Sequence, residues 1–321
     1  MTDTLLHAYV PLVFWTGLGL LLVKFLPDSF PRFLGRSLYW VGVPVQIFTL
    51  ARQTDFSAQV GLVPAIAILG LIIGICLASI ALLFLERQAA CADGEEPERT
   101  GNPWAIGSRR GSFMISSILG NTGFVGLAVT PNFIAEPFQG WIVLYSVSHN
   151  VIGTYGIGVL LASFYGRPQA SNPWFTTLRD VLTVPSLWAF ALGMLTRSIP
   201  FPWVIEDGLH YSLWVIIPAA LLLMGIRLRQ IKGWQGLKTG LIPASIKMIG
   251  LPLLVGCIAT ALHLSANPRL ALVLMAGMPT AFAGLILAEE YELDRELIAS
   301  SIVVTTSTLF LALPVWLVLF G

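Results

Sequence analysis

The residues best suited to contact a ligand lie inside two long apolar stretches that contain helix-breaking residues. The first stretch contains Gly120-Asn121-Thr122-Gly123 and reaches Pro131, and the second contains Pro279 followed by Thr280 near its middle. Glycine and proline interrupt helices, and an interruption inside an apolar stretch frees backbone amides and carbonyls that can contact a bound molecule. We therefore expect two broken helices; a kink in a continuous helix is the alternative for each stretch alone.

The side chain of Asn121 is the expected main ligand among these residues. Its amide can donate a hydrogen bond to a carboxylate and accept one from a hydroxyl or an N–H group. The flanking glycines allow another backbone to approach closely. The predicted binding residues at the two breaks are Asn121, Thr122, Gly123, Pro131, Pro279 and Thr280.

Two ionisable residues in other apolar stretches are candidates for coupling or charge compensation. A buried lysine is costly unless it is paired, so Lys247 either faces the breaks, where it would counter an anion or carbonyl groups, or extends its side chain to the membrane surface. His149 has an ordinary pKa near neutrality, which leaves a proton-coupling role open beside a purely structural one. The remaining histidines and the three cysteines are scattered, so we expect no metal, no cofactor and no enzyme.

Membrane helices must position these residues. Apolar residues make up 56% of the 321 residues and charged residues 11%, whereas an ordinary soluble domain has about 25% charged residues. The mean hydropathy is +0.80. A spanning helix needs roughly 20 apolar residues. Ten stretches qualify as candidate spans: residues 8–26, 35–52, 57–85, 111–135, 138–165, 181–197, 208–226, 239–262, 269–288 and 297–320.

Loop charges predict the orientation of these spans. Lysine and arginine are retained on the cytoplasmic side, and one set of alternate loops contains 14 of them where the other contains 3. Both termini are therefore predicted outside the cytoplasm, and the acidic stretch 93–98 inside it. No basic tract or zinc-finger spacing is present, which excludes nucleic acid as a partner.

The chain also contains an internal repeat. Gly61-Leu62-Val63-Pro64-Ala65 in the third span matches Gly240-Leu241-Ile242-Pro243-Ala244 in the eighth, and 37–44 in the second matches 212–218 in the seventh. The repeat unit is therefore five helices, residues 1–168 and 169–321 of one integral membrane domain. Because each unit has an odd number of spans, the second half must cross the membrane in the opposite sense to the first. This arrangement is typical of transporters whose ligand binds between the halves. A duplicated scaffold without transport is the alternative.

These motifs resemble the auxin efflux carrier family, a group of PIN-like secondary transporters within the bile acid and auxin carrier type of inverted-repeat fold. The stretch from Gly120 to Leu127 is similar to the family's glycine-asparagine crossover, and the stretch from Met278 to Pro314 is similar to its last two helices. The resemblance implies crossed, broken helices in spans four and nine, implies that Asn150 bonds the crossover, and leaves a homodimer open. The family usually has proline at Ala128 and often has asparagine near Ala283.

The expected function is secondary transport by alternating access in the plasma (inner) membrane. The resemblance favours an efflux carrier for a small organic anion, such as an auxin-like or dicarboxylic acid. A sodium- or proton-coupled symporter of another small metabolite is the alternative, and a membrane enzyme or sensor is the reading from a different class. Substrate, coupling ion, direction of flux and oligomeric state stay open.

Overall fold

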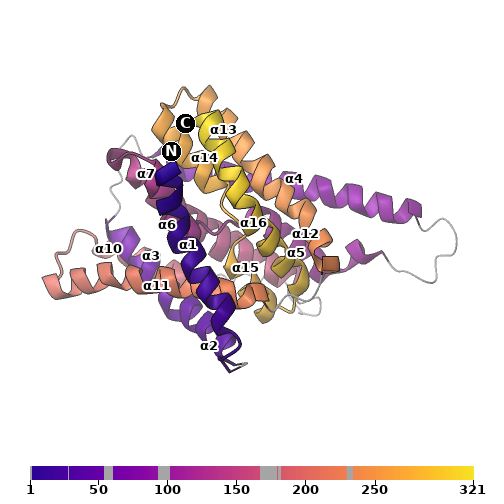
Figure 1. Ribbon diagram of the computed structural model, residues 1–321, viewed down its shortest axis with the longest axis horizontal. Helices are drawn as coiled ribbons and strands as arrows, with labels where there is room; N and C mark the ends of the chain where they lie inside the picture. Colours follow the sequence, from indigo (N-terminus) through magenta and orange to yellow (C-terminus); the bar gives the residue numbers. More distant parts are fainter. Residues whose placement is uncertain are drawn as a thin grey trace.

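Helices make up nearly all of the described residues. A computed structural model describes residues 2–27, 29–53, 61–92, 102–166, 179, 182–229 and 234–321 (Figure 1). Within these ranges the only β-type pairing is an isolated bridge between Gly120 and Thr280. The all-α prediction is therefore confirmed. The predicted boundary between the halves and the acidic stretch 93–98 lie outside the described residues.

The described residues of the first half form eight α-helices and several short π or 3₁₀ segments. They are α1 (Thr2–Leu22), α2 (Phe30–Ser37), η1 (Leu38–Gly42), α3 (Val43–Gln53), α4 (Leu62–Ala92), η3 (Pro103–Ala105), α5 (Gly107–Ile118), η4 (Thr122–Gly126), α6 (Leu127–Val129), η5 (Thr130–Phe133), η6 (Glu136–Phe138), α7 (Gln139–Ser148), η7 (His149–Gly158) and α8 (Val159–Gly166). The runs α2–η1–α3 and α7–η7–α8 are each one helix containing a π-helical segment, a feature frequent at functional sites.

The described residues of the second half form seven α-helices and one π-helical segment. They are α10 (Pro185–Thr196), α11 (Trp203–Arg229), α12 (Trp234–Ser245), η8 (Ile246–Gly250), α13 (Leu251–Ala261), α14 (Ala266–Ala276), α15 (Phe282–Glu290) and α16 (Arg295–Phe320). The run α12–η8–α13 is again a single helix with a π-helical turn. The helix α10 begins with Pro185 in its first turn, where the missing N–H costs nothing.

Five of the described helical runs are long and apolar enough to cross a membrane. They are Leu62–Ala89, Glu136–Gly166, Trp203–Arg227, Leu237–Ala261 and Arg295–Phe320. Large apolar side chains on the outer faces are exposed to 67% or more, among them Leu21, Leu195, Trp214, Leu311 and Val318. Such a surface is stable in lipid. The count of ten spans stays a prediction, because the other segments are shorter or interrupted.

The helices pack as two groups. The first packing group consists of α1, α2–α3, α10 and α11, in which α1 lies along α11 and α3 lies along α10. Gly19 faces the carbonyl of Leu222, and Gly225 faces that of Thr16, so α1 and α11 approach to a distance that a side chain would prevent. The second packing group consists of α4, α5, α7–α8, α12–α13, α14, α15 and α16. Both termini lie at the same end of the molecule (Figure 1).

Candidate functional site

Two helices of the second packing group are interrupted. The helix α5 ends at Ile118 because Leu119 takes an extended conformation, with φ −84° and ψ 117°, and helix resumes at Thr122. The helix α14 ends at Ala276, and α15 begins at Phe282. Between them lies Pro279, which has no N–H to continue a helical ladder. Both stretches are therefore broken rather than kinked.

Pro131 lies outside the first interruption, and its predicted role in substrate binding stays a prediction. It lies in the first turn of the 3₁₀ helix η5, beyond η4 and α6. Proline fits that position because the first turn of a helix has no partner for its N–H. The chain breaks at Leu119–Asn121, where Leu119 is extended and Asn121 is also non-helical, with φ −76° and ψ 59°.

The two interruptions pair with each other through their backbones. The amide of Ala281 donates to the Leu119 carbonyl at 2.8 Å, and the amide of Asn121 donates to the Pro279 carbonyl at 2.7 Å. This pairing forms the isolated bridge between Gly120 and Thr280. Backbone groups inside a membrane protein must find partners within the protein, and each interruption supplies partners to the other.

Asn121 caps the helical turn that follows the first interruption. Its Oδ1 accepts hydrogen bonds from the amides of Phe124 at 3.3 Å and Val125 at 3.5 Å, and the residue is 6% exposed. A side chain at position 120 would place its Cβ 2.8 Å from the Lys247 ammonium, which explains the glycine there. Asn121 is therefore held in one orientation by the backbone of its own segment.

Lys247 lies inside the protein, so the alternative of a side chain extended to the membrane surface is wrong. It is 1% exposed, and its ammonium donates to the carbonyl of Ala276 at 2.7 Å. Ala276 is the last residue of α14, where unpaired carbonyls concentrate partial negative charge. The lysine thus compensates the partial negative charge at the end of the broken helix. Its ammonium also lies beside Gly120 of the other interruption.

His149 and Thr305 satisfy one freed amide each. The amide of Gly120 donates to Nε2 of His149 at 3.1 Å, and the amide of Thr280 donates to the Thr305 hydroxyl at 3.0 Å. A histidine that accepts through Nε2 carries its proton on Nδ1 when neutral. The structural part of the His149 prediction therefore agrees with the geometry, and its proton-coupling part stays a prediction.

Other polar side chains hold the segments around the interruptions. Nδ2 of Asn150 donates to the Thr122 hydroxyl at 3.1 Å, which is the expected contact with the crossover. The Thr280 hydroxyl donates to the Ser116 carbonyl at 3.0 Å. Nε2 of Gln46 in α3 donates to the Gly123 carbonyl at 2.6 Å. The contact of Gln46 joins the first packing group to the interruption in the second.

A small cavity of about 20 Å³, lined by both polar and apolar side chains, lies at the first interruption. That volume accommodates about one water molecule, so the site is closed in this conformation. Its lining includes three predicted residues, Asn121, Gly123 and Asn150, whereas Pro279, Thr280, Lys247 and His149 bond the interrupted backbone outside it. The full lining is Val43, Gln46, Gly120, Asn121, Gly123, Phe124, Asn150, Tyr155, Ala281, Phe282 and Ala283.

Two further lining residues were missed or underrated from the sequence. Gln46 carries a signal in the sequence, because it is an amide inside the apolar stretch 35–52. Tyr155 has no such signal, because a tyrosine in a membrane helix usually marks the interface. A second cavity of about 490 Å³ is lined by arginines that the sequence identified only as markers of topology. No group of three metal-binding side chains occurs in the part of the chain that the structure describes.

Comparison with known proteins identifies the family. A family model described as a membrane transport protein matches residues 107–317, which include both interruptions. This chain belongs to the auxin efflux carrier family. The carrier is 24% identical over 284 residues to an uncharacterized transporter of Methanothermobacter thermautotrophicus, covering 88% of this chain and 87% of the relative. It is 25% identical over 211 residues to an uncharacterized transporter of Methanocaldococcus jannaschii, covering 64% and 67%. The carrier is therefore an integral membrane protein with a transport function.

Proposed function

We propose that this carrier exports a small organic anion by alternating access, with the anion bound at the two interrupted helices. The observation on which this rests is the pairing of the two breaks, in which Asn121 bonds Pro279 and Ala281 bonds Leu119. Broken helices inside a membrane domain expose oriented backbone groups to a ligand without exposing them to lipid.

Equivalent contacts in the two halves support a fold of ten spans arranged as inverted repeats, residues 1–168 and 169–321. The packing of α1 on α11 joins spans one and seven, and that of α3 on α10 joins spans two and six, their counterparts. The contact of α4 with α5 likewise has its counterpart in α13 with α14. At the breaks, His149 of span five bonds Gly120, and Thr305 of span ten bonds Thr280. Such correspondence is expected when each half has the same internal structure.

The charge around the interruptions favours an anion. The buried Lys247 ammonium donates to the carbonyl of Ala276, a neutral group, so this contact does not cancel the positive charge. The cavity also includes Phe282 and Ala283, the first residues of α15, where helix amides concentrate partial positive charge. Both features lower the free energy of a carboxylate relative to a neutral molecule of the same size.

Relative movement of the two packing groups would open the closed cavity. The bond between Gln46 and the Gly123 carbonyl crosses between the groups and must break or change when they move. Given the loop charges, we place both termini outside the cytoplasm, in the plasma (inner) membrane. A cavity that holds about one water has to expand before an organic anion enters.

Substrate screening combined with changes at Asn121 tests the proposal. Purified carrier is heated with a panel of carboxylates and their matched amides, and we expect stabilisation by a carboxylate and not by its amide. The Asn121→Ala variant should bind that carboxylate roughly tenfold to hundredfold more weakly, the cost of one hydrogen bond to a charged group. Transport in proteoliposomes should fall with it.

Two companion variants separate binding from folding. Asn121→Asp retains an oxygen that accepts from Phe124 and Val125, so it should preserve the helix cap while repelling the anion. Asn132→Ala is the matched control, because Asn132 bonds the carbonyls of Ala128 and Val129 away from the cavity. Wild-type affinity in both Asn121 variants would contradict this assignment of the site.

A further inference from the structure

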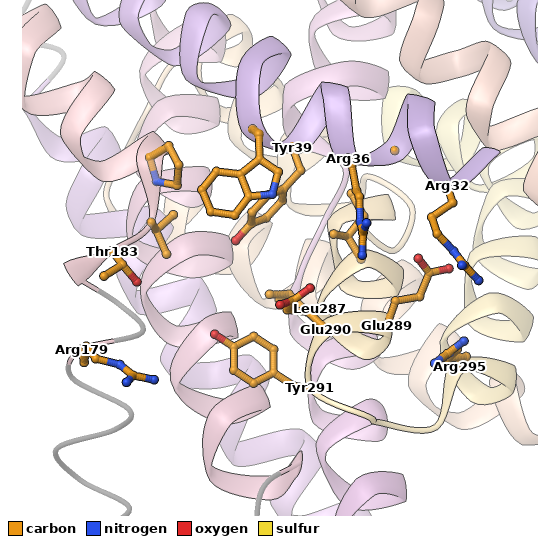
Figure 2. A pocket seen from close by; sticks show the side chains of 15 residues that line it. Arg32, Arg36, Tyr39, Arg179, Thr183, Leu287, Glu289, Glu290, Tyr291 and Arg295 are labelled. Carbon is orange, nitrogen blue, oxygen red and sulfur yellow. The ribbon is translucent and has the colours of Figure 1, made fainter. Parts of the chain in front are cut away.

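The larger cavity contains a concentration of arginines. It has a volume of about 490 Å³ and is bounded by α2, η1, the start of α10, the end of α15 and the start of α16 (Figure 2). Cavities of roughly 300–1,000 Å³ are typical of small-molecule sites. The charged side chains of the lining are Arg32, Arg36, Arg179, Arg295, Glu289 and Glu290.

Positive charge exceeds negative charge in this lining. The carboxylate of Glu289 is already paired with Arg227, at 2.9 Å, and Arg227 is not part of the lining. Figure 2 shows Glu289 between Arg32 and Arg295, whereas Arg36 extends from α2 into the cavity beside Tyr39. Arg36 therefore places a guanidinium on the side of the cavity that contains Tyr39.

Aromatic side chains indicate the other half of the ligand. Tyr39, Trp40 and Tyr291 line the cavity together with the arginines. Flat aromatic faces bind planar or apolar bodies, and a guanidinium binds a carboxylate through two parallel hydrogen bonds. A small carboxylate with an aromatic or apolar body matches both features.

The two cavities follow each other along the same two helices. Tyr39 of the larger cavity and Val43 of the smaller one are four residues apart on the continuous helix η1–α3, which corresponds to about 6 Å. On α15 the same step leads from Ile286 to Phe282. The rings of Tyr39 and Tyr155 meet edge to face, with centroids 5.8 Å apart. Since Tyr155 lines the smaller cavity, this pair lies between the two.

We propose that the arginine-lined cavity is a second carboxylate-binding site, in series with the site at Asn121, in which Arg36 binds the anion. The inference rests on the proposed function for its place on a transport route. The loop charges put this cavity on the cytoplasmic side, so it receives the anion first during export. An arginine here raises the local concentration of anions at the entrance to the closed site.

Equilibrium dialysis of the full-length purified protein tests this site with phenylacetate as the probe and phenylacetamide as its neutral partner. Detergent without anionic lipid is used, and the retention volume on gel filtration checks folding. We expect phenylacetate to bind and phenylacetamide not to bind. Arg36→Gln should weaken phenylacetate binding at this site by at least about tenfold, and Arg36→Lys, which keeps the charge, should weaken it less. Arg87→Gln is the matched control, because Arg87 lies on α4 outside both cavities.

The Asn121→Ala variant separates this inference from the proposed function. If both sites exist, Asn121→Ala retains the binding that Arg36→Gln removes. Loss of all binding in Asn121→Ala with none lost in Arg36→Gln would leave one site only and overturn the second. Phenylacetate binding that is lost in Arg36→Gln but unchanged in Asn121→Ala supports the arginine site while it contradicts the Asn121 assignment. The proposal of a carboxylate site is overturned if phenylacetate does not bind. It is also overturned if added phosphatidylglycerol occupies the arginine-lined cavity and phenylacetate does not displace it.

Discussion

Replacing Lys247 with methionine should impair anion binding without unfolding the carrier. Methionine fills a similar volume and removes the ammonium that bonds the Ala276 carbonyl at 2.7 Å. Loss of a hydrogen bond from a charged donor costs about 1.5–3 kcal/mol. A lysine inside a membrane helix itself costs about 2.5–3.5 kcal/mol, and the substitution removes that cost. The two contributions are opposite in sign and similar in size, so the melting temperature should change little.

The effect on a bound anion has no such compensation. The Lys247 ammonium is 2.8 Å from the position of a Cβ on Gly120, which lines the small cavity. An anion in contact with Gly120 is then about 6 Å from the ammonium. At an effective dielectric constant of about 20, two unit charges at that distance attract each other by about 3 kcal/mol. Loss of this attraction corresponds to roughly a hundredfold weaker binding.

The assay compares Lys247→Met with Lys238→Met, which removes the same charge from an exposed position on the same helical run. Thermal unfolding and binding of the carboxylate found by screening are measured on all three proteins. We expect Lys238→Met to equal the wild type in both, and Lys247→Met to differ in binding alone. A large loss of thermal stability with unchanged binding would refute the electrostatic role and leave the lysine a helix cap.

Three other predictions concern the interruptions and the topology. Gly120→Ala forces its Cβ against the lysine ammonium and should destabilise the carrier by about 1–3 kcal/mol in chemical denaturation, whereas Gly140→Ala, with no atom in reach, should not. Thr305→Val removes the hydroxyl that accepts from the buried amide of Thr280, and should lower the free energy of unfolding by about 1–3 kcal/mol. Thr308→Val should lower it less, because the Thr308 hydroxyl bonds the Val304 carbonyl of its own helix. Equal losses of stability in the two variants would contradict the role of Thr305. In a cysteine-free background, Glu95→Cys, outside the described residues, should react with impermeant maleimide only from the cytoplasmic side, and labelling of intact cells would reverse the orientation.

The helical fold was predictable because each element depends on local properties of the chain. Apolar runs such as 62–92 form helices in lipid because their backbone groups must bond within the segment. Proline marks some interruptions and not others, since Pro218 and Pro314 lie inside the continuous helices α11 and α16. The exact place of an interruption was less predictable. Gly120 and Pro131 both qualified as breakers, and only the backbone partner at Pro279 stabilises a break at the first of them.

The site was predictable in its residue types and not in its partnerships. Asn121 and Asn150 were identifiable as amides in apolar surroundings, and both line the small cavity. Whether Lys247 faced the protein or the membrane surface depended on a carbonyl supplied by a helix far along the chain, which periodicity cannot reveal. The same holds for Arg36, since loop arginines are equally expected from topology alone.

The two halves of the sequence differ at one point that bears on where the proposed anion would bind. Aligning Gly61–Ala65 with Gly240–Ala244, and allowing one or two inserted residues, places Lys247 opposite Ile66, Ala67 or Ile68, and all three are apolar. The first half thus has no equivalent of this ammonium, although its interruption is otherwise bonded as in the second. The charge of Lys247 lies beside Gly120 and the end of α14, and the apolar residues at the aligned positions of the first half do not balance it. An anion attracted by that charge should lie against the Gly120–Asn121 segment, which is why substitutions there are the most direct test of the site.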